Sequence, residues 1–537
     1  MEDFSTHDIP SELPAQTKSP WGTEHPQISL VARTITMDYL ATCVELLLGI
    51  FMLPFNTSHL GKSAYGLWVL TASITVYFGM LNLGYAESLV KFVSQYRAQK
   101  DATRLNEIIS TMFFVFAGVG ALAYAAAMIL ASDLGRLLSL SPEQARTGRY
   151  LLLIISAYVA LGFPFSVFGA VVNGFQRKYL NGSIAIATSI LVAVVNVIVL
   201  LLGYGLVELV ACTTAIRLLS YLGYRLTAYR VFPALRISTR HVRLSRLKEL
   251  TAFSVYMLLI DIANKLNYAT DVLVIGVFLN TAAVAIWAVA QRLTELTRRL
   301  TDQLSHALFP VVVDSATIGD NERLRLLFLQ ATRLSLAMVL PVCAVLALLS
   351  QQVVLLWVGP QFIESVPIIH ILAVVIIIRV GNSTAMTILK GAGKHRLLTV
   401  SNLTVAITNL SLSVILVRKY GLIGVALGTL IPLAAVCGFV LFPAACRSVN
   451  VSVSNALVRG VWPSVWPALC MAVLVGVSRS LLPISFLAVA SQAIVAGAFY
   501  LMLFFFLAIG SEERKWYLAK LRQITASQKL VSAQVSQ

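Results

Sequence analysis

Long apolar stretches alternate with short polar ones from Ile35 to Ile509. Each apolar stretch is about 20 residues long, enough for a helix rising 1.5 Å per residue to cross about 30 Å of hydrocarbon. The pattern predicts an all-α polytopic membrane protein with about fourteen transmembrane helices. The expected helices lie at 34–56, 64–86, 108–131, 150–173, 183–203, 205–224, 250–279, 281–312, 327–350, 362–389, 397–417, 420–445, 461–482 and 484–510.

The polar segment 1–29 comes before the first apolar stretch and has no apolar core of its own. We therefore expect a cytoplasmic tail rather than a cleavable signal peptide. Hydrophobic residues make up 58% of the 537 positions and charged residues only 12%, with a mean hydropathy of +0.82. A soluble chain carries about 25% charged residues, so the composition excludes a soluble protein.

The net charge of +17 is concentrated in alternate loops. Lysine and arginine gather at 91–104, 177–178, 225–249 and 390–396 and in the C-terminal tail, and they are few in the intervening loops. Because such residues favour the cytoplasmic side, we expect a multi-pass inner (plasma) membrane protein with both termini in the cytoplasm. The charge reflects topology and attraction to anionic membrane lipids, rather than binding of nucleic acid.

The second half of the chain resembles the first at an offset of about 219 residues; Trp68 recurs as Trp287 and Asp101 as Asp320. Further matches join Leu60 with Leu279, Arg104 with Arg323, the turn 173–178 with 390–395, and Tyr204-Gly205 with Tyr420-Gly421. Each repeat holds about six helices, an even number, so both copies insert in the same orientation. This predicts two six-helix lobes related by a pseudo-two-fold axis along the membrane normal, an arrangement typical of alternating-access transporters.

The repeat also sets the expected domain boundaries. They are a polar cytoplasmic N-terminal tail at 1–29, an N lobe at 30–224, a basic cytoplasmic linker at 225–249, a C lobe at 250–445, two C-terminal helices at 446–510 and a cytoplasmic tail at 511–537.

Several ionisable residues fall inside predicted helices, where a charge costs on the order of 3 kcal/mol. Asp38 and Glu45 lie on one face of the first helix, because they are two helical turns apart. In the seventh helix, Asp261 and Lys265 have the i, i+4 spacing of a self-pairing ion pair, whereas Asp271 has no local cation at that spacing. We therefore expect Asp271, Asp38 and Glu45 to be the candidates for binding a coupling H⁺ or Na⁺.

The eighth predicted helix is the most polar. Three- and four-residue steps place a hydrophilic stripe along one face, formed by Arg292, Glu295, Arg299, Asp302 and His306. Such a stripe must face a cavity or another charged helix. Because a guanidinium grips phosphate or diphosphate well, we expect Arg292 and Arg299 to bind an anionic substrate, with Arg217 and Arg379 as further candidates. The competing interpretation of Arg292 is a salt bridge to an aspartate of the first or seventh helix.

The sequence carries no catalytic, cofactor or metal-binding signature. Gly61-Lys62-Ser63 resembles the end of a phosphate loop, but the glycine needed five positions earlier is Asn56. The six cysteines are scattered singly, without disulfide or zinc spacing. We expect a transporter rather than an enzyme, driven by an ion gradient, the membrane potential or the gradient of its substrate.

Short motifs along residues 30–445 resemble one known family. In chain order they include Tyr65-Gly66-Leu67-Trp68, Asn82-Leu83-Gly84, Ile275-Gly276, Leu356-Trp357-Val358-Gly359 and Gly421-Leu422-Ile423-Gly424. This order is similar to that of the polysaccharide (oligosaccharide) flippases, which belong to the multidrug/oligosaccharidyl-lipid/polysaccharide exporter superfamily.

The resemblance implies two lobes arranged in a V around a cationic cavity. It also implies a lipid-linked glycan substrate on undecaprenyl diphosphate, which is flipped from the cytoplasmic to the periplasmic leaflet. In related peptidoglycan-precursor flippases, the arginine that matches Arg292 contributes to binding the headgroup. Those proteins also use arginines in their first two helices, where this chain carries Asp38 and Glu45. Glycan polymerases and glycosyltransferases are the partners that such a role implies.

Two other functions remain open at the level of sequence. A cation-coupled multidrug or small-molecule efflux transporter of the same superfamily would carry cavity carboxylates, as the first helix does, but not the arginines of the eighth. A membrane-embedded glycan polymerase or ligase would present a large outside loop, and the longest ones expected here, at 132–149 and 350–361, are short.

Overall fold

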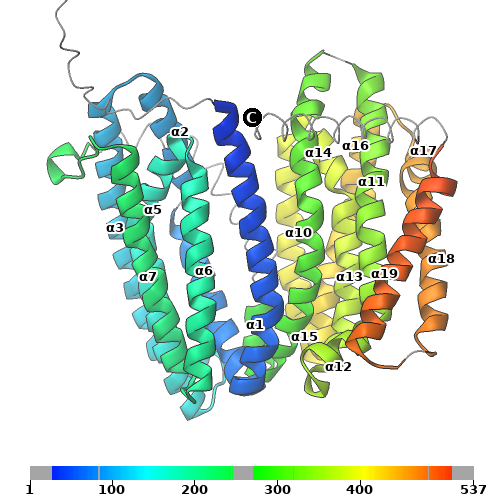
Figure 1. Ribbon diagram of the computed structural model, residues 1–537, viewed down its shortest axis with the longest axis horizontal. Helices are drawn as coiled ribbons and strands as arrows, with labels where there is room; N and C mark the ends of the chain where they lie inside the picture. The colour runs from blue at the N-terminus through cyan, green and yellow to red at the C-terminus, as the bar shows by residue number, and fades with distance from the viewer. Residues whose placement is uncertain are drawn as a thin grey trace, which may run out of the picture.

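The computed structural model describes residues 27–82, 85–243, 245, 270–318, 320–481, 483–510 and 514. These residues form helices and connecting turns, with no strand among them. The prediction of an all-α fold is therefore confirmed. Figure 1 shows two lobes side by side, with α1 (Gln27–Phe78) and α10 (Thr281–Ile318) packed together where the lobes meet.

The N lobe is built from the first half of the chain. After α1, its helices are α2 (Tyr85–Ala98), α3 (Ala102–Ser132), α4 (Leu134–Leu137), α5 (Pro142–Gly174), α6 (Lys178–Leu201) and α7 (Leu206–Val231).

The C lobe and two C-terminal helices follow. The helices of the C lobe are α9 (Thr270–Phe278), α10, α11 (Asn321–Leu348), α12 (Ser350–Trp357), α13 (Ser365–Gly381), α14 (Ser383–Gly391), α15 (His395–Val436) and α16 (Phe442–Ser448). Beyond them lie α17 (Val453–Ala456), α18 (Trp462–Ser478) and α19 (Phe486–Leu503). In Figure 1, α18 and α19 are at the outer edge of the C lobe, where α18 packs against α11.

Ten segments of the described residues are long and apolar enough to cross a membrane. Two of them, Thr36–Phe78 and His395–Ser448, are 43 and 54 residues long and contain a kink at a glycine with positive φ, Gly61 at 76° and Gly421 at 56°. Because about 20 residues suffice for one crossing, each holds two spans. The polar α10 is not among the ten, and the start of the seventh expected helix lies outside the described residues. Counting two spans in each kinked segment, and adding α10 and the seventh helix, to which α9 belongs, the structure agrees with the expected set of about fourteen helices.

The internal repeat is visible in the helix caps. Asp101 caps α3 by accepting a hydrogen bond from the backbone N–H of Arg104 at 2.9 Å. Asp320 caps α11 in the same way, with the N–H of Arg323 also at 2.9 Å. Such a cap stabilises a helix start by about 1 kcal/mol. Residues matched by the sequence repeat thus occupy equivalent places in the two lobes.

The packing of the lobes repeats as well. A side chain added at Gly174, the end of α5, would overlap Val93 of the N lobe. A side chain added at Gly391, the end of α14, would overlap Val312 of the C lobe. Val93 and Val312 are 219 positions apart, so the same small-to-large contact occurs twice.

Separate apolar cores hold the parts of the molecule together. Phe168 and Phe232 belong to the core among α2, α3, α5 and α7, whereas Trp287 lies in the core of the C lobe. A third core joins α11 and α13 to the C-terminal helices. There the hydroxyl of Tyr500 donates to the carbonyl of Ser464 at 3.1 Å. Because lipid is as apolar as these side chains, the cores stabilise the bundle through close van der Waals packing rather than through removal of apolar surface from water.

The basic segment after the sixth span lies against the N lobe. α7 continues to Val231, past the expected start of the linker at 225. The side chain of Asn106 on α3 then donates to the carbonyl of Ala234 and accepts from the N–H of Arg236, both at 2.9 Å. The described part of the linker is therefore fixed to α3 by hydrogen bonds.

Candidate functional site

The lobes touch at the end of the bundle that holds Ser63, which we call the Ser63 end. The hydroxyls of Ser63 and Thr281, at the start of α10, are 2.9 Å apart. The side chain of Gln144 donates to Ser63 at 2.8 Å. Gly66 lies so close to the carbonyl of Thr281 that any side chain at 66 would overlap it. Small and polar residues thus let the backbones of α1 and α10 approach closely here.

Two more contacts join α1 to the C lobe. The indole N–H of Trp357 at the end of α12 donates to the carbonyl of Ile50 on α1 at 2.7 Å. The ammonium of Lys62 lies 5.5 Å from the centre of the Phe362 ring, a cation–π geometry. The Lys62 contact adds to the Ser63 contact at the Ser63 end, whereas Ile50 lies next to Gly49, farther from that end along α1.

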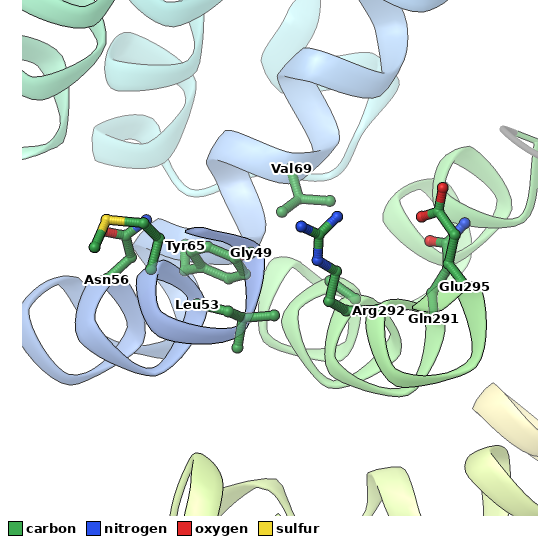
Figure 2. Close-up of a pocket in the computed structure, with 10 residues that line it drawn as sticks. Gly49, Leu53, Asn56, Tyr65, Val69, Gln291, Arg292 and Glu295 are labelled. Carbon is green, nitrogen blue, oxygen red and sulfur yellow. The ribbon is translucent and has the colours of Figure 1, made fainter. Parts of the chain in front are cut away.

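A cavity of about 280 Å³ lies between α1 and α10. Its lining comes from Gly49, Met52, Leu53, Asn56, Tyr65 and Val69 of the N lobe and from Ala288, Gln291, Arg292 and Glu295 of the C lobe. Figure 2 shows Arg292 pointing toward α1, whereas Gln291 and Glu295 leave α10 on another side. We call this the interlobe cavity.

Arg292 spans the interlobe cavity. Its Nη2 donates to the backbone carbonyl of Glu45 at 3.2 Å. A side chain at Gly49 would overlap the guanidinium, which therefore lies directly against the helix backbone of α1. Asn56 and Tyr65 complete the polar lining, and within the described residues the buried Oδ1 of Asn56 has no hydrogen-bond partner. The cavity thus offers a charged donor and an orphaned polar atom.

A second cavity, of about 160 Å³, lies within the C lobe and shares Gln291 and Glu295 with the first. It is lined by Asp271, Trp287, Gln291, Thr294, Glu295, Leu372, Val375, Ile376, Arg379 and Thr429. The side chain of Arg379 lies close enough for its charge to act on Asp271. The buried indole N–H of Trp287 has no acceptor among the described residues. We call this the C-lobe cavity.

Asp271 belongs to a buried polar cluster beside the C-lobe cavity. It is 7% exposed and accepts a hydrogen bond from the hydroxyl of Thr429 at 3.2 Å. Asn409 Oδ1 lies 3.5 Å from the same hydroxyl and accepts from Ser413 at 3.0 Å. Helices α9 and α15 thus bring four oxygen-bearing side chains together in the interior of the lobe. Buried polar groups with such partners avoid the penalty of an unpaired polar atom.

The remaining residues expected from the sequence lie elsewhere. Asp38 pairs with Lys178 of α6, with Oδ2 and Nζ 2.7 Å apart and both side chains about half exposed. Glu45 is an exposed residue of α1, and its backbone carbonyl accepts a hydrogen bond from Arg292. Arg217 is exposed on α7 and lines neither cavity.

Some expectations lie outside the described part of the chain. They concern the pair of Asp261 with Lys265, and the side chains of Arg299, Asp302 and His306.

Among the described residues, Arg292 does not form the salt bridge to an aspartate that the competing interpretation predicts. Asp38 is paired with Lys178, and Asp271 contacts Thr429 and lines the C-lobe cavity, so neither aspartate is the partner of Arg292. The partner is instead a backbone carbonyl of the other lobe. The reason is the direction of the side chain, which leaves α10 toward α1.

The family model described as polysaccharide biosynthesis protein matches residues 60–367, more than half of the chain. The chain belongs to this family. A similar curated protein is the uncharacterized membrane protein EpsK of Bacillus subtilis (strain 168). It is 24% identical over 347 residues, which cover 63% of this chain and 68% of EpsK.

The fold of this polysaccharide biosynthesis protein is similar to those of solved transporters. The lipid II flippase MurJ in an inward closed conformation has a TM-score of 0.71 at 17% identity, covering 88% of this chain and 99% of MurJ. An inward-facing multidrug resistance transporter of the MATE family, in the MOP superfamily, has a TM-score of 0.60 at 17% identity, covering 79% and 98%. At these identities the likeness concerns the fold alone.

The region matched by the polysaccharide biosynthesis family contains Asp271, Arg292 and Glu295 but ends before Arg379 and Thr429. Sequence reasoning did not select Gly49, Asn56, Tyr65, Trp287 or Thr429 as site residues, although all of them line the two cavities. An asparagine or glycine inside a predicted span was the available signal, because each has a cost in an apolar helix.

Proposed function

We propose that this chain translocates a lipid-linked oligosaccharide of the undecaprenyl-diphosphate type from the cytoplasmic to the outer leaflet, for polysaccharide biosynthesis. The observation that supports this most directly is Arg292 in the interlobe cavity, where a guanidinium meets a polar lining between two lobes. A guanidinium forms charge-assisted, bidentate hydrogen bonds with phosphate oxygens, each worth about 1.5–3 kcal/mol. Family membership makes a glycan carrier the natural source of that phosphate.

We also propose how the protein is oriented in the membrane. The segments around α2, before α6 and after α7 lie at the end of the bundle opposite α12 (Figure 1), and they carry many described basic residues: Lys91, Arg97, Lys100, Arg104, Arg177, Arg230, Arg236, Arg240 and Arg243. By the positive-inside rule this end faces the cytoplasm of the inner membrane, as do both termini. The contacts at the Ser63 end then close the cavity toward the outside. Translocation requires these contacts to break while the cytoplasmic end closes.

Arg379 is the second arginine that we assign to the substrate path, because it lines the C-lobe cavity beside the shared Glu295. Arg299, seven positions after Arg292 in the sequence, stays a candidate from the sequence pattern alone. Arg217 ranks lower, since it lies on α7 away from both cavities. Enzymatic activity is not part of the proposal.

Ion coupling is assigned to the buried cluster around Asp271. A carboxylate beside hydroxyl and amide oxygens can take up H⁺ or Na⁺. Because α10 lines both cavities, a charge change at Asp271 would be felt by the residues shared between them. Asp38 has a simpler role, since its pairing with Lys178 holds α1 against α6. Glu45 contributes its backbone carbonyl to the contact with Arg292.

The alternative is cation-coupled multidrug efflux, which is favoured by the carboxylates of Asp271 and Glu295 in the C-lobe cavity. Proteoliposomes distinguish the two functions. The purified full chain is reconstituted with a fluorescent undecaprenyl-diphosphate-linked oligosaccharide, and the label that becomes protected from an external quencher is followed over time. We expect glycan translocation and no accumulation of a cationic dye. Dye transport without glycan translocation would select the alternative.

A further inference from the structure

Arg292 lies in an unusual place for a residue that awaits an anionic ligand. Its guanidinium rests on the backbone of α1, where Gly49 leaves room for it, and Nη2 reaches the carbonyl of Glu45 at 3.2 Å. Within a regular helix that carbonyl already accepts the N–H of residue 49. Arg292 therefore uses the second lone pair of a neutral acceptor.

The contact links the two lobes at a depth different from that of the Ser63 end. Arg292 follows Thr281 by eleven positions along α10, which corresponds to about 16 Å of helix. At Thr281 a backbone carbonyl lies against Gly66, whereas at Arg292 the mobile end of a long side chain lies against Gly49. The first contact is rigid and the second can be released by a rotation of the side chain.

An anionic ligand would compete for the same guanidinium. Hydrogen bonds between an ionised donor and an ionised acceptor are roughly twice as strong as those between neutral groups. A diphosphate entering the interlobe cavity would therefore draw Arg292 away from the Glu45 carbonyl. The link between α10 and α1 at this depth would break at the moment the ligand binds.

We propose that Gly49 is a positioning residue for Arg292, and that their contact is a latch between the lobes which a diphosphate group releases. This inference rests on the proposed function, because it takes the headgroup of that substrate as the releasing ligand. A ligand shifts a two-state equilibrium only through its different affinity for the two states. The latch supplies such a difference, because Arg292 is engaged in one state and available in the other.

The test measures the distance between the lobes in the full chain in lipid nanodiscs. Spin labels are attached through non-natural amino acids at Gln99 and Glu322, two exposed positions of the N and C lobes. This leaves the native cysteines in place. Pulsed electron resonance then reports the population of each lobe arrangement, without ligand, with undecaprenyl diphosphate and with inorganic pyrophosphate.

In the wild type, undecaprenyl diphosphate should move population from the resting arrangement to a second one with a different label distance. In Gly49→Ala and in Arg292→Ala, the second population should rise roughly tenfold without ligand, because a hydrogen bond of a charged group is lost. The matched control is Gly118→Ala on α3, which faces open space and should match the wild type. A shift with pyrophosphate as well would mean that the diphosphate suffices without its lipid.

Two results would overturn the latch. If Gly49→Ala and Arg292→Ala keep the resting populations of the wild type, while the wild-type chain still translocates the lipid-linked oligosaccharide, the latch is wrong and the proposed function stands. If both variants shift the populations but no diphosphate does so in the wild type, release by the headgroup is wrong. In that case the proposed function also loses its binding site.

Discussion

The two lobes share a framework but differ in what they carry at membrane depth. In the C lobe, α9 and α10 place Asp271, Gln291, Arg292 and Glu295 at the two cavities. The positions 219 residues earlier in the N lobe are Met52, Ala72, Ser73 and Val76. The caps of α3 and α11 and the packing of Gly174 and Gly391, by contrast, are the same in both.

The difference separates the features that fold the protein from the polar groups that would serve its proposed function. A charge in a membrane helix costs several kcal/mol unless it faces protein or water, so charges persist where they have a task. Features that a helix needs to begin, end or pack occur twice, whereas the polar groups of the cavities are concentrated in one copy. The N lobe contributes to the site mainly a surface, the backbone of α1 at Gly49, on which a residue of the C lobe rests.

The strongest test of this asymmetry exchanges matched positions. Arg292→Ala should lower glycan translocation in proteoliposomes by about 10- to 100-fold, the loss of one or two charge-assisted hydrogen bonds. Ser73→Ala, at the matched position of the N lobe, should stay within about twofold of the wild type, because no cavity depends on it. Similar losses in both variants would show that the lobes contribute equally.

The second test concerns the ion. Asp271→Asn should lower translocation about tenfold and remove its dependence on ion gradients, because an amide cannot bind a proton or carry the charge for a cation. The rate is measured with and without ionophores that collapse the H⁺ and Na⁺ gradients. Asp320→Asn, which keeps a good N-cap, is the control. Gradient-dependent transport by Asp271→Asn would remove the coupling role.

The third test addresses the rigid contact between the lobes. In Gly66→Ala the added methyl group would overlap the carbonyl of Thr281, so α1 and α10 must separate at the Ser63 end. We expect a loss of about 1–3 kcal/mol of stability in this arrangement. Hydrogen–deuterium exchange of peptides covering 62–68 and 281–285 should become faster. Unchanged exchange would mean that the close approach does not hold this end closed.

The smallest effects are expected from substitutions of the helix caps that both lobes share. Asp101→Ala and Asp320→Ala each remove one N-cap hydrogen bond and should each lower the free energy of unfolding by about 1 kcal/mol. Thermal unfolding in detergent measures both, and translocation at low temperature should be retained. A large loss in only one variant would mean that the two caps are not equivalent.

Much of the fold could be predicted from the sequence, because hydrocarbon imposes simple rules. The apolar runs indicated the helices, and the offset of about 219 residues indicated two lobes. The sequence placed Gly61 and Gly421 between predicted spans, but it did not reveal that each takes a positive φ that breaks the helix there and joins two spans with almost no connecting loop. The sequence also did not reveal that α7 continues past 225, where the linker was expected to begin. The helix can continue there because its arginines are good helix formers.

The site could be predicted only in part. Arg292 and Asp271 were identifiable, because charges at membrane depth must face a cavity or a partner. The partner of Asp38 was not, since Lys178 is 140 positions away along the chain. Gly49 carries no signal of its own, and its role follows from the direction of a side chain on another lobe. Contacts between distant segments require the three-dimensional arrangement.

The central claim is that the C lobe recognises an anionic headgroup through Arg292 beside α1. Equilibrium binding of undecaprenyl diphosphate to the purified full chain, followed by tryptophan fluorescence, tests it most directly. The account predicts saturable binding by the wild type and Ser73→Ala, and an affinity at least about tenfold weaker for Arg292→Ala. Equal affinity of Arg292→Ala and the wild type would contradict it.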